Sequence, residues 1–157
     1  MDLEALNIKN LPKQGPCGEC DDMVDYHIVH FKDRIHNVKG VEVIADEIVG
    51  ACDKCGSELW ITPLEEYNLK VIYDVYKKKV GLLTTQEIKD IRKKRGMSQK
   101  QLSQFLSIGE KDITRYENGS IQTRAVDLMI RMVADDTAYL VMSDVVNKTK
   151  SLQAKAE

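Results

Sequence analysis

Apolar and polar residues alternate along two stretches in the first third of the chain, residues 24–31 and 41–49, and both stretches are rich in β-branched residues. Alternation with a period of two is typical of strands that bury one face. A valine-lysine-glycine step at residues 38–40 separates the two stretches, and a third short apolar run covers residues 59–62. This pattern predicts short antiparallel strands.

The apolar pattern changes to a helical period after Pro63. Proline fits the first turn of a helix, where its missing N–H group is not needed. Glutamates near the start and lysines at residues 77–79 have the charge order that the helix dipole favours. Apolar residues recur at spacings of three and four, as on one face of a helix: Leu64, Tyr67, Val71, Ile72 and Val75. We therefore expect a connector helix over residues 63–80.

Helix-capping signals dominate the chain from residue 82 onward. Thr84 with Glu87, and Ser98 with Gln101, have the spacing of capping boxes, in which each side chain binds the other residue's backbone N–H. Glycines stand where the helical patterns stop. The pattern predicts five helices: one between Thr84 and Gly96, then Ser98–Leu106, about 110–118, one that carries Val126–Val133, and about 137–146.

These elements predict an α+β fold. A small β-rich domain is expected over residues 1–62 and the connector helix over 63–80. An all-α domain of about five helices is expected over residues 81–157.

The four cysteines form two Cys-x-x-Cys pairs separated by 31 residues, Cys17 with Cys20 and Cys52 with Cys55. Each pair places two thiolates on one tight turn, and two such turns complete the tetrahedral shell that zinc prefers. Unconnected thiols and redox pairs are the alternatives, but a redox pair usually opens a helix after a strand, a context that this region does not show. Because four thiolates leave no open coordination position, we expect one structural zinc ion per chain.

The sequence offers no candidate for an enzyme active site. No Ser/His/Asp or Cys/His set stands apart from the cysteine pairs, there is no phosphate-binding loop, and the acidic residues are scattered. Three histidines, His27, His30 and His36, lie in or beside the strand stretches, where we expect ordinary strand residues rather than metal ligands. We therefore expect a protein that binds rather than catalyses.

Charge is divided unevenly along the 157 residues, although the net charge is only −2. Residues 1–83 hold 10 basic and 15 acidic residues, and residues 84–157 hold 13 and 10, so the two parts carry −5 and +3. Within residues 87–124 there are nine basic and five acidic residues. Local positive charge of this kind favours contact with phosphate.

Two short helices, over residues 98–106 and about 110–118, are predicted with a three-residue turn between them. This is the arrangement that presents its second helix to the major groove of DNA. A generic small helical bundle would give the same periodicity, but the local positive charge favours the DNA-binding interpretation.

Residues 98–102 (SQKQL) and 113–119 (ITRYENG) resemble the Xre/Cro family of phage-repressor-type domains. With residues 82–88 and the cysteine pairs added, the chain resembles the MqsA/YgiT-like antitoxins over most of residues 15–135. The resemblance implies a zinc-binding N-terminal domain that holds a cognate toxin. It also implies a C-terminal helix-turn-helix domain that forms a homodimer on palindromic operator DNA and represses the protein's own operon.

The resemblance also implies roles for individual residues. Lys111 and Arg115, one turn apart on the second helix, would read base edges, in keeping with the pairing of such cations with guanine. Glu110 would accept a hydrogen bond from cytosine or, more in keeping with its position, complement the helix N-terminus. The basic run at residues 92–95 would contact the DNA backbone or lie in solvent. Phosphate contacts are implied for three residues: Gln99, Lys100 and Thr114.

Four positions depart from the family pattern. Asp21 follows Cys20, whereas a glycine follows Cys55. Ser107 occupies a turn position that is commonly glycine, Gly109 replaces a Ser or Thr cap, and Ser103 replaces a small apolar residue. These departures concern the geometry of the turns.

Cellular location and assembly complete the expectations. The N-terminal residues lack the features of a secretory signal, and no apolar run reaches the roughly 18 residues of a membrane span, so we expect a cytoplasmic protein with no membrane partner. The last predicted helix is apolar on more than one side and is the expected dimer surface, the alternative being packing on the fourth helix. A stand-alone repressor of a phage or mobile element is the alternative to an antitoxin.

Overall fold

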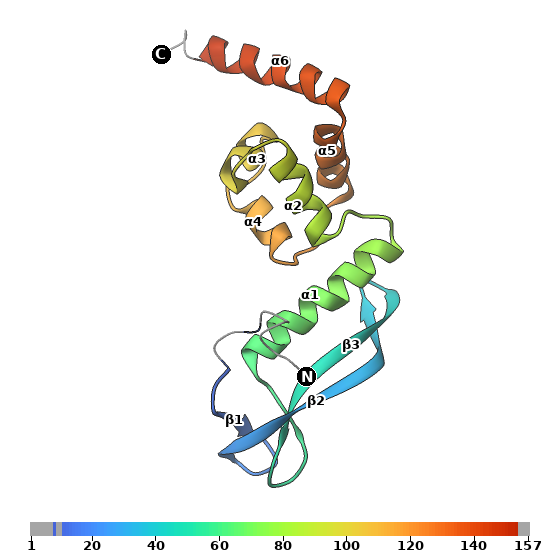
Figure 1. Cartoon of the computed structure of the whole chain (residues 1–157), viewed down its shortest axis with the longest axis vertical. Helices are drawn as coiled ribbons and strands as arrows, with labels where there is room; N and C mark the ends of the chain where they lie inside the picture. Colours follow the sequence, from blue (N-terminus) through green and yellow to red (C-terminus); the bar gives the residue numbers. More distant parts are fainter. Residues whose placement is uncertain (1–7, 9–10, 154–157) are drawn as a thin grey trace. The chain divides into compact units, whose positions relative to one another are not determined.

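The computed structural model describes residues 8 and 11–153 of the chain (Figure 1). The chain divides into two compact units, Met1–Lys79 and Val80–Glu157. Among the described residues, the first unit contains an antiparallel sheet and one helix, and the second contains five helices. The α+β fold expected from the sequence is therefore confirmed.

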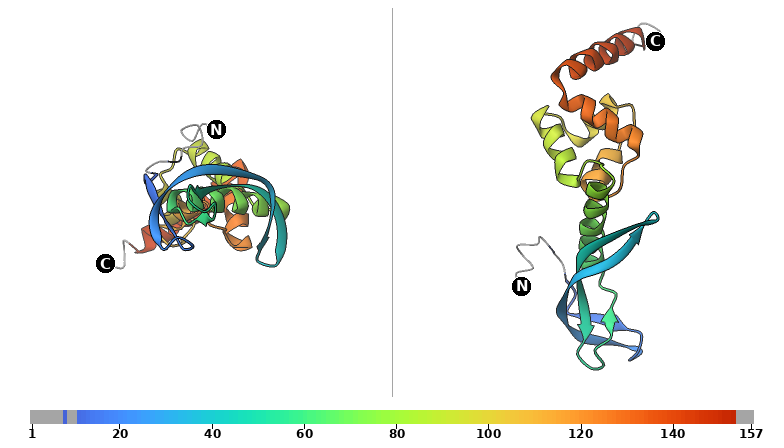
Figure 2. Two further views of the ribbon diagram at one scale, coloured as in Figure 1. Left: turned by 90° about the horizontal axis from the view of Figure 1, so that it is seen from below. Right: turned by 90° about the vertical axis from the view of Figure 1, so that its right-hand side faces the viewer.

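The sheet of the first unit has four strands in the order β1-β2-β3-β4, and every neighbouring pair is antiparallel. Figure 2 shows the long hairpin that β2 and β3 form. The other two strands are much shorter and pair only near the base of this hairpin. The strand bounds are β1 Gln14–Cys17, β2 Asp22–Val38, β3 Val41–Cys52 and β4 Glu58–Leu59.

The hairpin turn lies where the sequence predicts it, but β2 is longer than expected. Lys39 and Gly40 both have positive φ, 51° and 80°, which is the pattern of a two-residue type I′ turn. An irregularity in the β2–β3 register falls between Phe31 and Arg34, with Asp33 at φ 55°. This bulge breaks the alternation of apolar residues, so the sequence pattern stops at residue 31 although the strand continues.

Helix α1, Thr62–Lys79, packs against β3 within the first unit. Its buried Asn68 donates to the carbonyl of Ile48 (2.8 Å) and accepts from the N–H of the same residue (2.9 Å). One side chain therefore pairs both backbone groups of a residue in β3, as a neighbouring strand would. The buried core of this unit consists of Ile8, Cys17, Val24, Ile48, Cys52, Leu59, Ile61 and Leu64.

The second unit contains the five helices that the sequence predicts. Both capping boxes are present, at the N-termini of α2 and α3. The five bounds are α2 Thr85–Lys94, α3 Gln99–Phe105, α4 Asp112–Glu117, α5 Arg124–Ala134 and α6 Asp136–Gln153. The core that they enclose consists of Leu83, Ile88, Leu102, Leu106, Ile113, Val126, Ile130 and Val133.

A buried carboxylate joins α5 to the segment that precedes α2. Asp127 has no exposed surface and accepts hydrogen bonds from the N–H of Leu83 (2.7 Å), from Gln122 (3.1 Å) and from Arg131 (2.8 Å). Burial alone would raise the pKa of Asp127, but these hydrogen bonds outweigh it and hold the pKa below its ordinary value. The segment before α2 is thus fixed by an ionised side chain.

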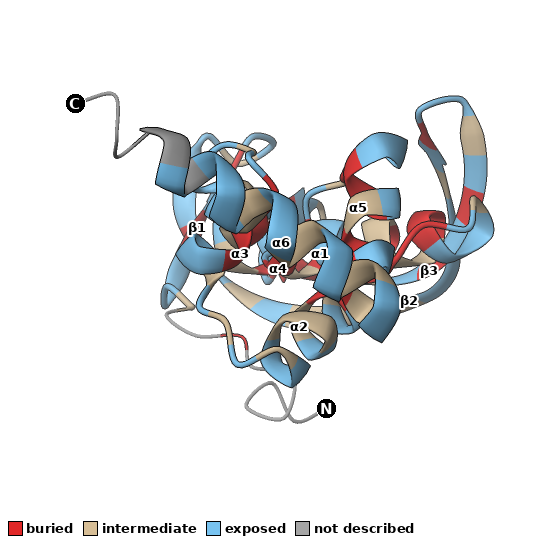
Figure 3. Cartoon of the chain, turned by 90° about the horizontal axis from the view of Figure 1, so that it is seen from above, coloured by how far each residue is buried: buried red, intermediate tan, exposed pale blue. Residues whose placement is uncertain are grey.

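Helix α6 is seven residues longer at its C-terminal end than the sequence pattern predicts, because the apolar spacing stops near residue 146. Figure 3 shows that most of this helix is exposed. Within the part of the chain that the structure describes, no helix is both long and apolar enough to cross a membrane.

Candidate functional site

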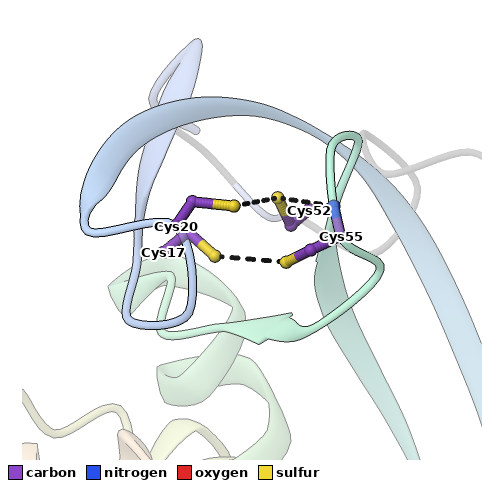
Figure 4. A group of neighbouring side chains, drawn as sticks. All are labelled: Cys17, Cys20, Cys52 and Cys55. Atoms are coloured by element: carbon purple, nitrogen blue, oxygen red, sulfur yellow. Dashed lines mark hydrogen bonds between the residues drawn. The ribbon is translucent and has the colours of Figure 1, made fainter.

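The four cysteines lie together at one end of the sheet (Figure 4). Cys17 ends β1 and Cys52 ends β3, while Cys20 and Cys55 lie in the turns that follow these strands. The antiparallel pairing of β1 with β2 and of β2 with β3 brings the C-terminal ends of β1 and β3 to the same end of the sheet. Residues that are more than 30 positions apart in the sequence therefore form one cluster.

The geometry of the cluster fits a tetrahedral metal site. All four sulfur atoms lie within 4.8 Å of one another. The Sγ atoms of Cys17 and Cys55 are 3.5 Å apart, and those of Cys20 and Cys52 are 3.9 Å apart. A tetrahedral ion with metal–sulfur bonds of about 2.3 Å requires sulfur–sulfur distances of about 3.8 Å. The cysteines can thus supply four ligands with little rearrangement.

The acidity of the thiols also fits a site for a cation. A hydrogen bond with Ser57 lowers the pKa of Cys17 to about 6, and a hydrogen bond with the same hydroxyl lowers the pKa of Cys55. Hydrogen bonds with Cys55 and Cys17 raise the pKa of Cys20 to about 12. Thiols packed this closely do not all ionise alone, whereas a bound cation stabilises four thiolates together.

The two turns that carry the cysteines have related backbones. Asp21 has φ 50° and Gly56 has φ 77°, so both residues after the second cysteine of a pair are left-handed. An aspartate tolerates this conformation better than most residues. An ion pair (3.1 Å) joins Lys54 of the second turn to Asp22, the first residue of β2 directly after the first turn. The absence of glycine at position 21 therefore leaves the turn geometry intact.

The histidines lie outside the sulfur cluster. His27 pairs with Asp53 (2.7 Å) and His30 with Asp46 (3.2 Å), both at the surface of the sheet. Nε2 of His36 is buried and has no hydrogen-bond partner among the described residues. The group of potential ligands found in the described part of the chain contains cysteines alone.

A second group of polar side chains joins α2, α3 and α4. Arg92 of α2 forms a two-pronged ion pair with Glu117 of α4, whose Oε2 lies 2.8 Å from the arginine nitrogen. Gln99 of α3 donates to the same carboxylate (2.9 Å) and accepts from the hydroxyl of Thr114 (2.9 Å). Buried Ser103 accepts from the N–H of Ile113 (3.4 Å). These contacts fix α4 relative to α3.

Charged residues occupy the exposed side of α4 and the N-cap position that precedes it. Lys111 is exposed at the helix N-cap, and Arg115 is exposed one turn later. Arg115 pairs with Asp112, whose carboxylate also accepts from the N–H of Gly109 (3.0 Å) in the turn before the helix. Lys111 and Arg115 therefore point to solvent from one short helix.

The other residues implicated by the sequence resemblance differ in exposure. Lys100 is exposed and pairs with exposed Glu110 (3.1 Å). Gln99 and Thr114 are half-buried, and hydrogen bonds connect Gln99 to Thr114 and to Glu117. Of these residues, Lys100 has the greatest freedom to reach a ligand.

Two of the departures from the family pattern lie in α3 and in the turn that follows it. Ser107 has φ 55°, the conformation that explains why glycine is common there. Ser103 has no exposed surface, and its hydroxyl gives α4 a hydrogen bond that an apolar residue would not.

The basic run at residues 92–95 contains two arginines that bind within the fold and two lysines that are exposed. Arg92 is committed to Glu117, and Arg95 donates to the carbonyls of Val133 (2.8 Å) and Ala134 (3.2 Å). The two lysines between them are exposed. No local pattern predicts the pair between Arg92 and Glu117, because the partners are 25 positions apart and each also suits a solvent-exposed helix face.

Fold and site together define a two-part protein, in which a sheet with a four-cysteine metal site is followed by a five-helix unit. The chain belongs to the MqsA family, described as the antitoxin component of a bacterial toxin-antitoxin system, and matches it over residues 16–139. The family is regulatory rather than catalytic, and membership implies a toxin partner. Comparisons with curated proteins and with solved structures gave no significant match.

The buried carboxylate of Glu117 should control the stability of the α2–α4 group. Burial alone would raise its pKa, but hydrogen bonds from Arg92 and Gln99 lower it below the ordinary value. The lowered pKa means that this stabilisation is present above about pH 4.3, the ordinary pKa of glutamate, and is lost as the pH falls through the folded-state pKa. Glu117→Gln should therefore destabilise the second unit by about 2 kcal/mol at pH 7 and reduce its acid sensitivity.

Hydrogen exchange of the α3 and α4 amides between pH 7 and pH 3 measures this effect, after correction for the intrinsic rate. Glu110→Gln is the matched control, since its exposed pair with Lys100 should contribute less than about 1 kcal/mol. Equal effects of the two substitutions would contradict the assigned role of Glu117.

Proposed function

We propose that this antitoxin-family protein is a dimeric, sequence-specific DNA-binding repressor that neutralises its toxin and represses its own operon. The observation that carries the DNA-binding part is the presentation of Lys111 and Arg115 on α4, which the network of Glu117 fixes against α3. Two helices held in this way support a helix-turn-helix assignment, with α4 as the groove-reading helix.

Lys111 and Arg115 are the proposed base-reading residues. Asp112 holds the guanidinium of Arg115 from one side, and an arginine has five N–H donors, so donors remain for guanine O6 and N7. Glu110 pairs with Lys100, which supports its role in local charge balance rather than in cytosine recognition. Lys100, Gln99 and Thr114 remain the proposed phosphate contacts.

The metal in the four-cysteine site is proposed to be one structural zinc ion per chain. Four thiolates are ligands that zinc prefers, and they complete its tetrahedral shell without leaving a position for water or substrate. Cys17, Cys20, Cys52 and Cys55 would therefore hold the short strands β1 and β4 to the hairpin. Zinc supplies a cross-link here and no reactive centre.

The first unit is proposed to bind the toxin. Its excess of acidic residues, net −5, disfavours contact with DNA phosphate and suits a basic protein partner. The division assigns toxin binding and DNA binding to separate units of one chain. A homodimer formed through the second unit would match the two-fold symmetry of a palindromic operator.

Substitution of the proposed reading residue should change specificity as well as affinity. Arg115→Ala should weaken binding by about 1–3 kcal/mol and relax sequence preference, because a bidentate contact to guanine is lost. Lys100→Ala should weaken binding to all DNA sequences alike. It should also reduce the slope of the logarithm of the binding constant against the logarithm of salt concentration by about one unit. Fluorescence anisotropy with the DNA directly upstream of the coding sequence, at several salt concentrations, measures both.

Exposed Lys70, in the first unit, provides the control, and Lys70→Ala should bind as the unaltered chain does. If Arg115→Ala retained full sequence preference, α4 would not be the reading helix.

Removal of the metal should unfold the first unit selectively. Elemental analysis should return about one zinc per chain, and chelation should expose the amides of β1–β4 to exchange while α2–α5 stay protected, because the two units have separate cores. Cys52→Ser should have the same effect. Ser57→Ala, which alters a neighbour of the sulfurs but no ligand, should keep the metal. A metal-free chain with a fully protected sheet would rule out the structural role.

Toxin neutralisation should depend on the first unit and not on base reading. When the product of the adjoining reading frame is expressed and arrests growth, co-expression of this chain should restore growth. Arg115→Ala should restore it equally well, whereas Cys52→Ser should fail because the sheet unfolds. An adjoining gene without toxicity would favour a stand-alone repressor of a phage or mobile element.

A further inference from the structure

The four sulfur atoms of the cysteine cluster differ in how far solvent reaches them. Cys17 and Cys52 are buried, Cys20 is half-buried and Cys55 is exposed. A dissolved reagent can therefore reach one candidate ligand in each Cys-x-x-Cys turn, because a thiolate must be accessible to react. Exposure by itself ranks Cys55 ahead of Cys20.

Three of the sulfurs accept hydrogen bonds from groups outside the cluster. Sγ of Cys52 accepts from the backbone N–H groups of Lys54 (3.3 Å) and Cys55 (3.5 Å), and Figure 4 shows the second of these bonds. The hydroxyl of Ser57 lies 3.0 Å from Sγ of Cys55 and 3.2 Å from Sγ of Cys17. The backbone N–H of Ser57 also donates to Cys55. The exposed sulfur thus has two donors on one neighbouring residue.

Cys20 differs from the other three cysteines, since its sulfur has only sulfur partners among the described residues. Its Sγ lies 3.9 Å from that of Cys52, and its backbone N–H donates to Cys17. A metal ion binds deprotonated thiols, so hydrogen bonds between sulfurs are lost when it binds. Within the described part of the chain, the Cys20 sulfur would then have no hydrogen-bond donor.

Hydrogen bonds control how nucleophilic a metal-bound thiolate is. A donor holds negative charge on the sulfur, and most of that bond is lost when the sulfur becomes a neutral thioether. Loss of one hydrogen bond to a charged acceptor is large enough to slow the reaction by about ten-fold. Lys54 brings positive charge near Cys20, but its ammonium is paired with Asp22 (3.1 Å) and so neutralises little of the sulfur's charge.

We propose that Cys20 is a modification site, the ligand at which carbon electrophiles react first with the metal-loaded chain. The sulfur lone pair forms a bond to carbon, and the leaving group departs with the electron pair of the bond that breaks. No proton is released, because the thiol is already ionised. Ser57 keeps the more exposed Cys55 less reactive. This inference goes beyond the proposed function and rests on its zinc site.

Reaction at Cys20 would weaken the first unit. The thioether carries no negative charge, so the site would keep three thiolates and bind zinc less tightly. Cys20 lies in the turn between β1 and β2, and β1 has only four residues. That turn would lose one of its links to the end of β3. A carbon electrophile would thereby loosen the unit that is proposed to hold the toxin.

Limited alkylation of the full zinc-loaded chain tests the order of reaction. Iodoacetamide in sub-stoichiometric amount should modify Cys20 about ten-fold faster than Cys55, with iodide as the leaving group. Chelation and an isotopically heavy form of the reagent then label the remaining thiols. Mass spectrometry gives the ratio at each cysteine, because trypsin cleaves after Lys54 and fragmentation separates Cys17 from Cys20. Reaction at Cys55 that is as fast or faster would overturn the proposal.

The variant Ser57→Ala tests the physical cause. Loss of the hydroxyl should raise the rate at Cys55 by roughly three- to ten-fold and leave the rate at Cys20 unchanged, with zinc retained. Ser120→Ala, at an exposed serine of the second unit, is the matched control and should change neither rate. An unchanged rate at Cys55 in Ser57→Ala would overturn the assignment of reactivity to hydrogen bonding.

Zinc release separates this inference from the proposed function. A chromogenic chelator should register zinc in step with modification of Cys20, and zinc that stayed bound after complete modification would overturn the loosening of the site. A chain purified without zinc would overturn the structural zinc of the proposed function and this inference with it. A zinc-loaded chain that reacts first at Cys55 would overturn this inference alone.

Discussion

The convergence of four sulfur atoms is the constraint on which the first unit depends. β1 has four residues and β4 has two, and strands of this length contribute little pairing of their own. Both are connected through cysteine turns to the long hairpin of β2 and β3, and those turns meet at the sulfur cluster. The site is therefore part of the architecture, because a cation bound there would fix the strand ends that the sheet alone holds weakly.

The second unit also contains elements that are too short to be stable alone, and a buried ion pair holds them together. Helices α3 and α4 have seven and six residues, too few to be stable alone, and α4 has no side-chain cap from its N-cap residue. The ion pair of Arg92 with Glu117, extended by Gln99, connects three helices around one carboxylate. Since the exposed charges of α4 are useful only on a fixed helix, this internal pair is the physical basis of the proposed reading surface.

Local patterns predicted much of this arrangement. Capping boxes at Thr84 and Ser98 gave the starts of two helices, and the structure contains both boxes, because capping depends on residues only three positions apart. Strand β1 had no such signal, since its four residues QGPC contain no alternation. β2 continued past the predicted end because a bulge shifted the register of its side chains. The pair of Arg92 and Glu117 had no local signal either.

Periodicity, helix caps and Cys-x-x-Cys spacing act over a few residues, so the α+β class, the five-helix unit and the identity of the four candidate ligands could be predicted from the residues alone. Three other outcomes required the packed structure: the sulfurs share one site, Arg92 and Arg95 bind within the fold while Lys111 and Arg115 face solvent, and α6 leaves Val141 and Val145 exposed. These outcomes depend on which surfaces meet after folding, and residues of one chemical type are equally suited to a buried pair or to a ligand contact until packing assigns them.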